Sequence, residues 1–263
     1  MHFKRLIVAL FLLPLFYLYI MYLSSEYFLL LLIIAGIIAI WEFNSMYNVE
    51  YLFRYAGIIS GVTILIISYI FKDILLDIIL LSFILIISTR LFFKRNPVSS
   101  LSDVSPTLLS LLYIPCLLTF QNRIREPGPE WVILLYAMVW SADTFAYYTG
   151  TLIGGKKLYV EVSPKKTIAG AIGSVVGGAA GAIIVKTTIL PSFKTLSALV
   201  TGIIVGSITV IGDLVESMFK RDAGVKDSGV IIPGHGGILD KIDGVLFAGP
   251  ILYWILLATK VIK

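Results

Sequence analysis

The chain contains few of the residues on which soluble or disulfide-stabilised domains depend. Only 14% of its 263 residues are charged, two are histidine and one is cysteine, whereas 58% are hydrophobic. This composition, with a mean hydropathy of +0.96, excludes an ordinary soluble globular domain. Because Cys116 is the only cysteine, an intrachain disulfide and a cysteine metal site are excluded, and its place in an apolar run predicts a buried, inert thiol. The sequence also lacks a Walker A loop and the G-x-S-x-G and H-E-x-x-H motifs, so no alternative catalytic set stands out.

Long apolar runs dominate what is present. About nine of them have roughly 15–22 residues, and about 20 are needed for a helix to cross a bilayer. The first run follows a basic N-terminus, as in a signal peptide. It is long and lacks a small-x-small cleavage site, so we expect it to remain as a membrane helix. The sequence therefore predicts an all-α fold, a polytopic integral membrane protein with about nine transmembrane helices. The runs lie at 6–23, 27–43, 55–71, 74–93, 104–120, 131–153, 168–190, 195–218 and 244–262.

The basic residues predict how the chain is oriented in the membrane. A net charge of +5 would fit a nucleic-acid-binding protein, but the 21 bases lie mainly in loops between apolar runs, so we expect no nucleic-acid partner. With nine spans and an inside N-terminus, about two thirds of the Lys and Arg residues fall on the cytoplasmic side. We therefore expect a multi-pass protein of the cell inner (cytoplasmic) membrane. Its N-terminus and the polar loops at 154–167 and 219–243 would face the cytoplasm.

The two parts of the chain differ in the polarity of their apolar runs. Residues 1–125 are rich in Leu, Ile and Phe, and we expect them to form N-terminal transmembrane helices. Residues 126–263 have Gly, Ala, Ser, Thr and Asp within the runs, and we expect a C-terminal transmembrane catalytic region there. Gly173, Gly177 and Gly181 follow a small-xxx-small spacing, which predicts close helix packing around a polar centre.

Acids and bases are concentrated in residues 212–244. On one helix, Asp213, Ser217 and Lys220 would fall at i, i+4 and i+7, along a stripe that Arg221 extends. An acid inside the membrane in line with a base at the surface suits a metal and its phosphate ligand. The alternative is an internal ion pair that ties helices together.

Two further features follow in the same stretch. Asp240 and Asp243 are three residues apart, so at the start of a helix both point the same way and could hold Mg²⁺ through carboxylate oxygens. Acids that favour the helix dipole are the alternative. His235 lies in PGHGG, a turn that would let a phosphate approach the backbone closely. An ordinary turn residue is the alternative for it.

A second polar element lies at 163–170, SPKKTIAG. Lys165 and Lys166 supply positive charge and Thr167 is placed to cap the following helix, which together favour an anion site. The alternative is that the lysines only encode membrane topology. Asp143 stands in an apolar run, where an unpaired charge costs about 2.5–3.5 kcal/mol. We therefore expect it to pair with Lys165, Lys166 or a bound cation, either at a functional site or in a structural ion pair.

These motifs together resemble the integral-membrane phosphatidate cytidylyltransferases, also called CDP-diacylglycerol synthases. That family has Ser, then Lys-Arg, Lys-Asp, His-Gly-Gly and Asp-Arg-x-Asp. Elements at 143–147 and 163–167 also look like the family's, whereas Lys241 replaces Arg and Ala169 stands where an acid or amide is expected. Here the pattern reads Ser217, Lys220-Arg221, Lys226-Asp227, His235-Gly236-Gly237 and Asp240-Lys241-Ile242-Asp243.

The resemblance implies transfer of the cytidylyl group of CTP to phosphatidate, giving CDP-diacylglycerol and pyrophosphate in phospholipid biosynthesis. It implies CTP, phosphatidate and the lipid bilayer as partners and leaves a homodimer open. It also implies one or two divalent cations, at least one of them Mg²⁺, with room for a monovalent cation. The metal ligands would be Asp213, Asp240 and Asp243, with Asp227 as either a further ligand or the partner of a base. The catalytic residues would be Asp213, Asp240, Asp243 and Lys220. The substrate-binding residues would be Lys165, Lys166, Thr167, Ser217, Arg221, Lys226 and His235.

Two other functions fit parts of the pattern. A CTP-dependent polyprenol- or dolichol-kinase-like enzyme would transfer the γ-phosphate of CTP to an alcohol and release CDP instead of pyrophosphate. An ion-coupled membrane transporter would use its intramembrane acids to bind cations. The clustering of the acids at one face of the membrane, on the cytoplasmic side of the C-terminal half, argues against a transporter. The full run of Lys-Arg, Lys-Asp, His-Gly-Gly and paired Asp motifs favours the cytidylyltransferase over the kinase.

Overall fold

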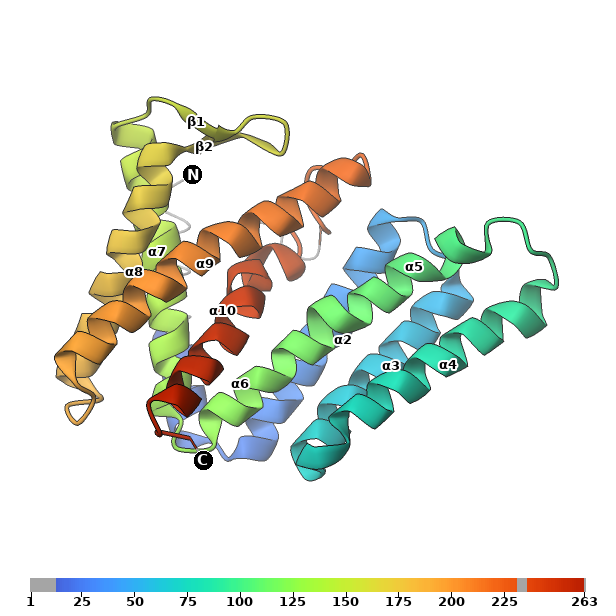
Figure 1. The fold of residues 1–263 in the computed structure, drawn as a ribbon, viewed down its shortest axis with the longest axis horizontal. Coiled ribbons are helices and arrows are strands. Elements are labelled where there is room, and N and C mark those ends of the chain that lie inside the picture. Colours follow the sequence, from blue (N-terminus) through green and yellow to red (C-terminus); the bar gives the residue numbers. More distant parts are fainter. Residues whose placement is uncertain (1–12, 231–235, 263) are drawn as a thin grey trace.

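The protein is nearly all helical in its computed structural model, which describes residues 13–230 and 236–262 (Figure 1). A short apolar helix, Leu13–Tyr22, precedes the numbered elements. Those elements are α2 (Ser25–Met46), α3 (Tyr51–Ile70), η1 (Lys72–Ile74), α4 (Leu75–Lys94), α5 (Ser100–Leu111), η2 (Leu112–Cys116), α6 (Leu117–Arg125), α7 (Glu130–Leu152), β1 (Lys157–Tyr159), β2 (Ser163–Thr167), α8 (Ile168–Thr188), α9 (Thr195–Asp222) and α10 (Leu239–Ala258).

Seven helices in the described part of the chain are long and apolar enough to cross a membrane, with α5, η2 and α6 counted as one rod from residue 100 to 125. The predicted helical, multi-pass character is confirmed, but the count of about nine is not. The run predicted at 6–23 is described only from residue 13 onward. The run predicted at 131–153 forms the 23-residue helix α7, whose Asp143 and aromatic residues make it less apolar than the seven.

The helices form two groups (Figure 1), and the larger of two buried apolar clusters has members in both. Helices α7, α8, α9 and α10 lie together, with the β1–β2 hairpin at one end of α7 and α8, and α2 to α6 lie beside them. Helix α10 contacts α9 and α7 on one side and α6 and α2 on the other. Phe43 of α2, Leu135 of α7 and Leu252 of α10 accordingly belong to a single buried apolar cluster. Helix α10 is therefore the element through which the N-terminal helices reach the polar residues of the C-terminal ones.

Glycines bring α7, α8 and α9 into backbone contact. A Cβ atom on Gly181 of α8 would lie 2.6 Å from the carbonyl oxygen of Ala137 in α7. A Cβ atom on Gly206 of α9 would lie 2.5 Å from the carbonyl oxygen of Ser174 in α8. Neither position has room for a larger side chain, so the predicted close packing of the glycine-rich run is confirmed.

A short β-hairpin replaces the loop that we expected at residues 154–167. Strands β1 and β2 are antiparallel and pair Lys157 with Thr167 and Tyr159 with Ser163. Gly154 and Gly155, at φ values of +64° and +85°, turn the chain from the end of α7 into β1. The hairpin leads directly into α8 and so fixes where the lysines before that helix lie.

Candidate active site

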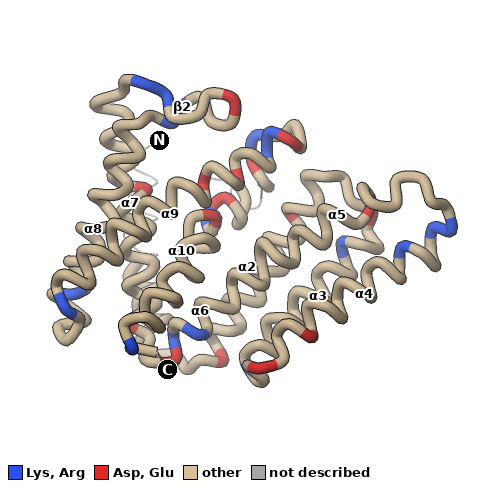
Figure 2. The backbone as a smooth tube through the Cα atoms, in the orientation of Figure 1, with Lys and Arg blue, Asp and Glu red and all other residues tan. Residues whose placement is uncertain are grey.

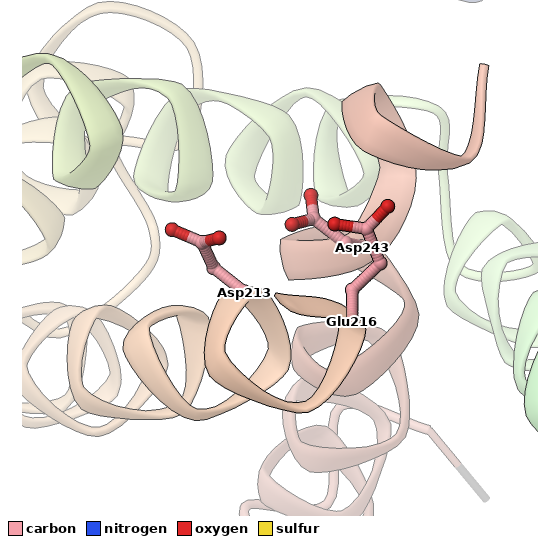
Figure 3. Close-up of side chains that lie close together, drawn as sticks. All are labelled: Asp213, Glu216 and Asp243. Carbon is pink, nitrogen blue, oxygen red and sulfur yellow. The ribbon is translucent and has the colours of Figure 1, made fainter. Parts of the chain in front are cut away.

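Three carboxylates meet where α9 packs against α10 (Figure 3). Asp213 and Glu216 come from α9 and Asp243 from α10, and each offers an oxygen within 4.8 Å of the others. The two residues of α9 share a face because they are three positions apart. A Cβ atom on Gly212 would lie 2.8 Å from the carbonyl oxygen of Asp243, so the glycine is what allows the two helices to bring their acids together. We call Asp213, Glu216 and Asp243 the acidic cluster.

The acidic cluster has the chemistry of a metal site. Carboxylate oxygens are the ligands that hard divalent cations prefer. Glu216 is only 1% exposed, and its Oε1 atom has no hydrogen-bond partner among the described residues. Because an unpaired buried carboxylate oxygen is costly, a cation there would satisfy it. The cluster could therefore hold a metal ion. We did not predict Glu216 as a ligand, although its position one turn after Asp213 is a signal that could have identified it.

Lys220 connects the acidic cluster to the start of α10. Its Nζ atom lies 2.6 Å from Oδ1 of Asp240 and also donates a hydrogen bond to Oε2 of Glu216. The side chain is buried, so the two acids compensate its charge in a poorly solvated place. The predicted stripe of α9 thus ends in a lysine held between two carboxylates. Its predicted catalytic role stays a prediction.

Asp240 is oriented by the segment that leads into α10. Its Oδ2 atom accepts hydrogen bonds from the backbone N–H of Gly237 at 2.7 Å and from the N–H and hydroxyl of Ser228 at 3.1 and 2.9 Å. With Lys220 on Oδ1, both oxygens have partners, and the structure does not bring Asp240 into the acidic cluster. The spacing of Asp240 and Asp243 on one helix is as expected, but their carboxylates have different partners. Metal ligation by Asp240 stays a prediction.

A cavity of about 560 Å³ lies beside the acidic cluster, between α7, α8, α9, α10 and the hairpin. Lys165 and Lys166 line it together with Asp213, Asp240 and Asp243. It thus combines acids that suit a cation with bases that suit phosphate oxygens. Figure 2 shows the same mixture of acidic and basic segments where α9 ends and α10 begins.

Two contacts fix the hairpin side of this cavity. The Nζ atom of Lys166 lies 2.6 Å from Oδ1 of Asp213, which joins the hairpin to the acidic cluster. Oγ1 of Thr167 accepts a hydrogen bond from the N–H of Gly170 at 3.0 Å, so the predicted cap of α8 is confirmed. Asp143 lines the same cavity. We expected Asp143 to pair with Lys165, Lys166 or a cation, but the ion pair of Lys166 is with Asp213.

The other predicted site residues lie around this centre or outside it. Ser217 is buried on α9. Arg221 donates to the carbonyl oxygens of Val162 and Val225 at 3.3 and 3.1 Å, and so ties the end of α9 to the hairpin. Lys226 and Asp227 are exposed, and Asp227 is not part of the acidic cluster. The prediction for His235 falls outside the described residues.

The fold and the site define a helical multi-pass membrane protein with a metal-compatible, lysine-lined cavity. The model of the cytidylyltransferase family matches residues 3–259, and the chain belongs to that family. Among curated proteins it is similar to a phosphatidate cytidylyltransferase of Staphylococcus saprophyticus, at 34% identity over 83% of this chain and 85% of the relative. A Staphylococcus epidermidis protein of the same name is 32% identical over 86% and 88% of the two chains. One of Synechocystis is 44% identical over 46% and 41%.

Proposed function

We propose that this protein is a phosphatidate cytidylyltransferase, which converts CTP and phosphatidate to CDP-diacylglycerol and pyrophosphate in phospholipid biosynthesis. The observation that carries the proposal is the cavity in which Lys165 and Lys166 face the acidic cluster within a bundle of apolar helices. A reaction between a nucleoside triphosphate and a lipid phosphate needs that combination, because two anions must be brought together. Membership of the cytidylyltransferase family and the names of the relatives agree with it.

The cofactor we propose is Mg²⁺, as one or two ions. Asp213, Glu216 and Asp243 would hold the first of them, since their oxygens already lie together and the buried Oε1 of Glu216 has no partner in the described part of the chain. When bound, the ion supplies positive charge that stabilises the negative charge on the reacting phosphate groups. Lys220 offsets the negative charge of Glu216 and Asp240. This compensation lets Asp240 lie close to the acidic cluster where α9 packs against α10.

The lysines of the hairpin would bind the triphosphate of CTP. Lys166 now pairs with Asp213, and we propose that its ammonium group turns to a phosphate oxygen when the nucleotide enters the cavity. Thr167 caps the first turn of α8, which fixes the backbone position of the neighbouring Lys166. The phosphate of phosphatidate is already ionised, and its attack on the α-phosphorus of CTP needs little help from a general base.

We also propose that the cavity opens on the cytoplasmic side, where CTP is found. The hairpin and the end of α9 carry bases at the end of the bundle where the cavity lies, in agreement with the excess of positive charge on cytoplasmic loops. Tyr147 lines the cavity and is exposed on α7, so the lipid headgroup could enter between helices while its acyl chains stay in the bilayer. In this account residues 126–263 carry the catalytic groups and residues 1–125 support them.

Product analysis tests the proposed reaction. Purified protein with CTP, phosphatidate and Mg²⁺ should release one pyrophosphate for each CDP-lipid formed. Release of CDP with a phosphorylated lipid alcohol would instead identify a kinase. Binding of cations without any turnover of CTP would point to a transporter.

A further inference from the structure

We propose that Glu42, a buried acid of α2 in the N-terminal part of the chain, is a positioning residue of the catalytic site. This proposal rests on the proposed function, because the site that Glu42 would position is the cytidylyltransferase site. Glu42 is 3% exposed although it lies in a mostly apolar helix. A charged residue at such a place is costly unless it has partners. Among the described residues, Glu42 accepts hydrogen bonds from Ser228, in the connection between α9 and α10, and from Ile238 and Leu239 at the start of α10.

Glu42 of α2 caps the N-terminus of α10. Its Oε1 accepts the backbone N–H of Ile238 at 3.0 Å, and its Oε2 accepts that of Leu239 at 2.9 Å. The first N–H groups of a helix have no partner within it, and α10 has no cap from the side chain at its own N-cap position. A carboxylate at that end satisfies these groups and is stabilised by the helix dipole. Residues 196 positions apart thereby fix where α10 begins.

Ser228 transmits this contact to the catalytic acids. Its Oγ atom lies 3.2 Å from Oε2 of Glu42 and 2.9 Å from Oδ2 of Asp240. Asp240 in turn holds Lys220, whose second partner is Glu216 of the acidic cluster. A continuous chain of polar contacts therefore runs from α2 to the proposed metal ligands. A hydroxyl has one hydrogen to donate, so the serine is shared between two acceptors.

Two glycines, which have no side chain, make room for the carboxylate of Glu42. A Cβ atom on Gly229 would lie 2.8 Å from Cδ of Glu42, and one on Gly237 would lie 2.6 Å from the same atom. The carboxylate is thus enclosed by backbone on two sides. Such a fit explains how a helix of the apolar N-terminal part can set the position of Asp240, and with it Asp243 one turn later.

The test compares Glu42→Gln with Glu50→Gln in the full-length purified protein. Glu50 also lies in the N-terminal part, but it is half exposed and pairs with Lys94 at 3.0 Å, far along the chain from α10. Glutamine at 42 keeps the size but offers N–H groups where Oε2 now accepts two hydrogen bonds. We expect kcat/KM for CTP to fall, and the Mg²⁺ concentration for half-maximal activity to rise, by about tenfold or more, the range for residues that orient metal ligands. Glu50→Gln should match the wild type in both.

A second readout does not depend on turnover. Mg²⁺ added without substrate should raise the apparent unfolding temperature of the wild type, and should do so less, or only at higher concentration, in Glu42→Gln. If Glu42→Gln keeps the wild-type KM, kcat and Mg²⁺ response, Glu42 is only structural and the proposal is wrong, whatever the variant's stability. If it does not fold, Ser228→Ala must show the same changes, and wild-type constants there overturn the proposal. A wild type that responds to Mg²⁺ but makes no CDP-lipid contradicts the proposed function alone.

Discussion

The Nζ atom of Lys166 lies 2.6 Å from Oδ1 of Asp213, inside a cavity that both residues line. The lysine comes from the β-hairpin and the acid from α9, so the ion pair joins the base-rich and acid-rich walls of the site. A base held in this position can exchange a carboxylate for a phosphate without leaving the cavity.

Replacing Lys166 with Gln should weaken CTP binding. A hydrogen bond to a charged group contributes about 1.5–3 kcal/mol, so we expect KM for CTP to rise by roughly ten- to a hundredfold. Lys156→Gln is the matched control, because Lys156 is an exposed lysine of the same connection that does not line the cavity. Steady-state kinetics with varied CTP measures both. Equal KM values for the two variants would argue against a phosphate contact by Lys166.

Asp240→Asn should remove most of the activity. Asparagine cannot accept hydrogen bonds at both positions, so either Lys220 or the N–H and hydroxyl donors of Gly237 and Ser228 lose an acceptor. Loss of one partner of a buried charge pair costs about 2–5 kcal/mol, and we expect kcat/KM to fall by about a hundredfold or more. Asp222→Asn is the control, since Asp222 is exposed and bonded to the Tyr47 hydroxyl at 2.9 Å. Near-normal turnover of Asp240→Asn would contradict the account.

Glu216→Gln should change the requirement for metal more than the binding of nucleotide. It removes one charge from the acidic cluster and one partner of Lys220. We expect the Mg²⁺ concentration for half-maximal activity to rise by about tenfold or more, and Mn²⁺ to restore part of the rate. Titration of activity with each cation at saturating CTP measures this. Glu161→Gln, an exposed acid in the hairpin, should behave as wild type. An unchanged cation titration for Glu216→Gln would exclude it as a ligand.

Gly212→Ala should force α9 away from α10. The added Cβ atom would lie 2.8 Å from the carbonyl oxygen of Asp243 and 3.2 Å from Cβ of Phe247. Overpacking of this kind costs about 1–3 kcal/mol, so the apparent unfolding temperature and the activity should both fall. Gly249→Ala on α10 is the control, because its nearest new contact would be an ordinary 3.8 Å. Thermal unfolding in detergent measures both, and equal stability of the two variants would contradict the packing argument.

The apolar pattern predicted most of the helices, because a membrane helix needs a long apolar run and little else. The run at 195–218 begins where α9 begins and misses only its polar last turn, which ends at Asp222. The apolar run at 244–262 begins five residues after α10 does, because Leu239 to Asp243 are too polar to belong to it. The helix start that we considered for Asp240 and Asp243 is nevertheless present. Polar first turns are hard to assign from hydropathy alone.

Parts of the candidate site were predictable because they depend only on residues close together in the sequence. The spacing of Asp213 and Lys220 on α9 and the cap at Thr167 follow from local geometry, and both are present. Glu216 was overlooked, although the reasoning used for Asp240 and Asp243 applies equally to it. The hairpin could not be read from the sequence, because strands of three and five residues give almost no periodic signal.

The long-range contacts of the site could not be predicted from the sequence. Nothing near Glu42 indicates that it reaches a backbone segment almost 200 positions later, and a single acid in an apolar run has many explanations. The orientation of Asp240 could not be predicted for the same reason, since it depends on the backbone N–H groups of Ser228 and Gly237. The site therefore depends on tertiary contacts between the two parts of the chain.

The proposed cytidylyl transfer is tested most directly by following the α-phosphate of CTP. Purified full-length protein in detergent is incubated with α-labelled CTP, phosphatidate and Mg²⁺, and the lipid extract is counted. We predict label in a CDP-lipid, with one pyrophosphate released per lipid and no product after chelation of the metal. A folded sample that leaves all label in the aqueous phase would contradict it.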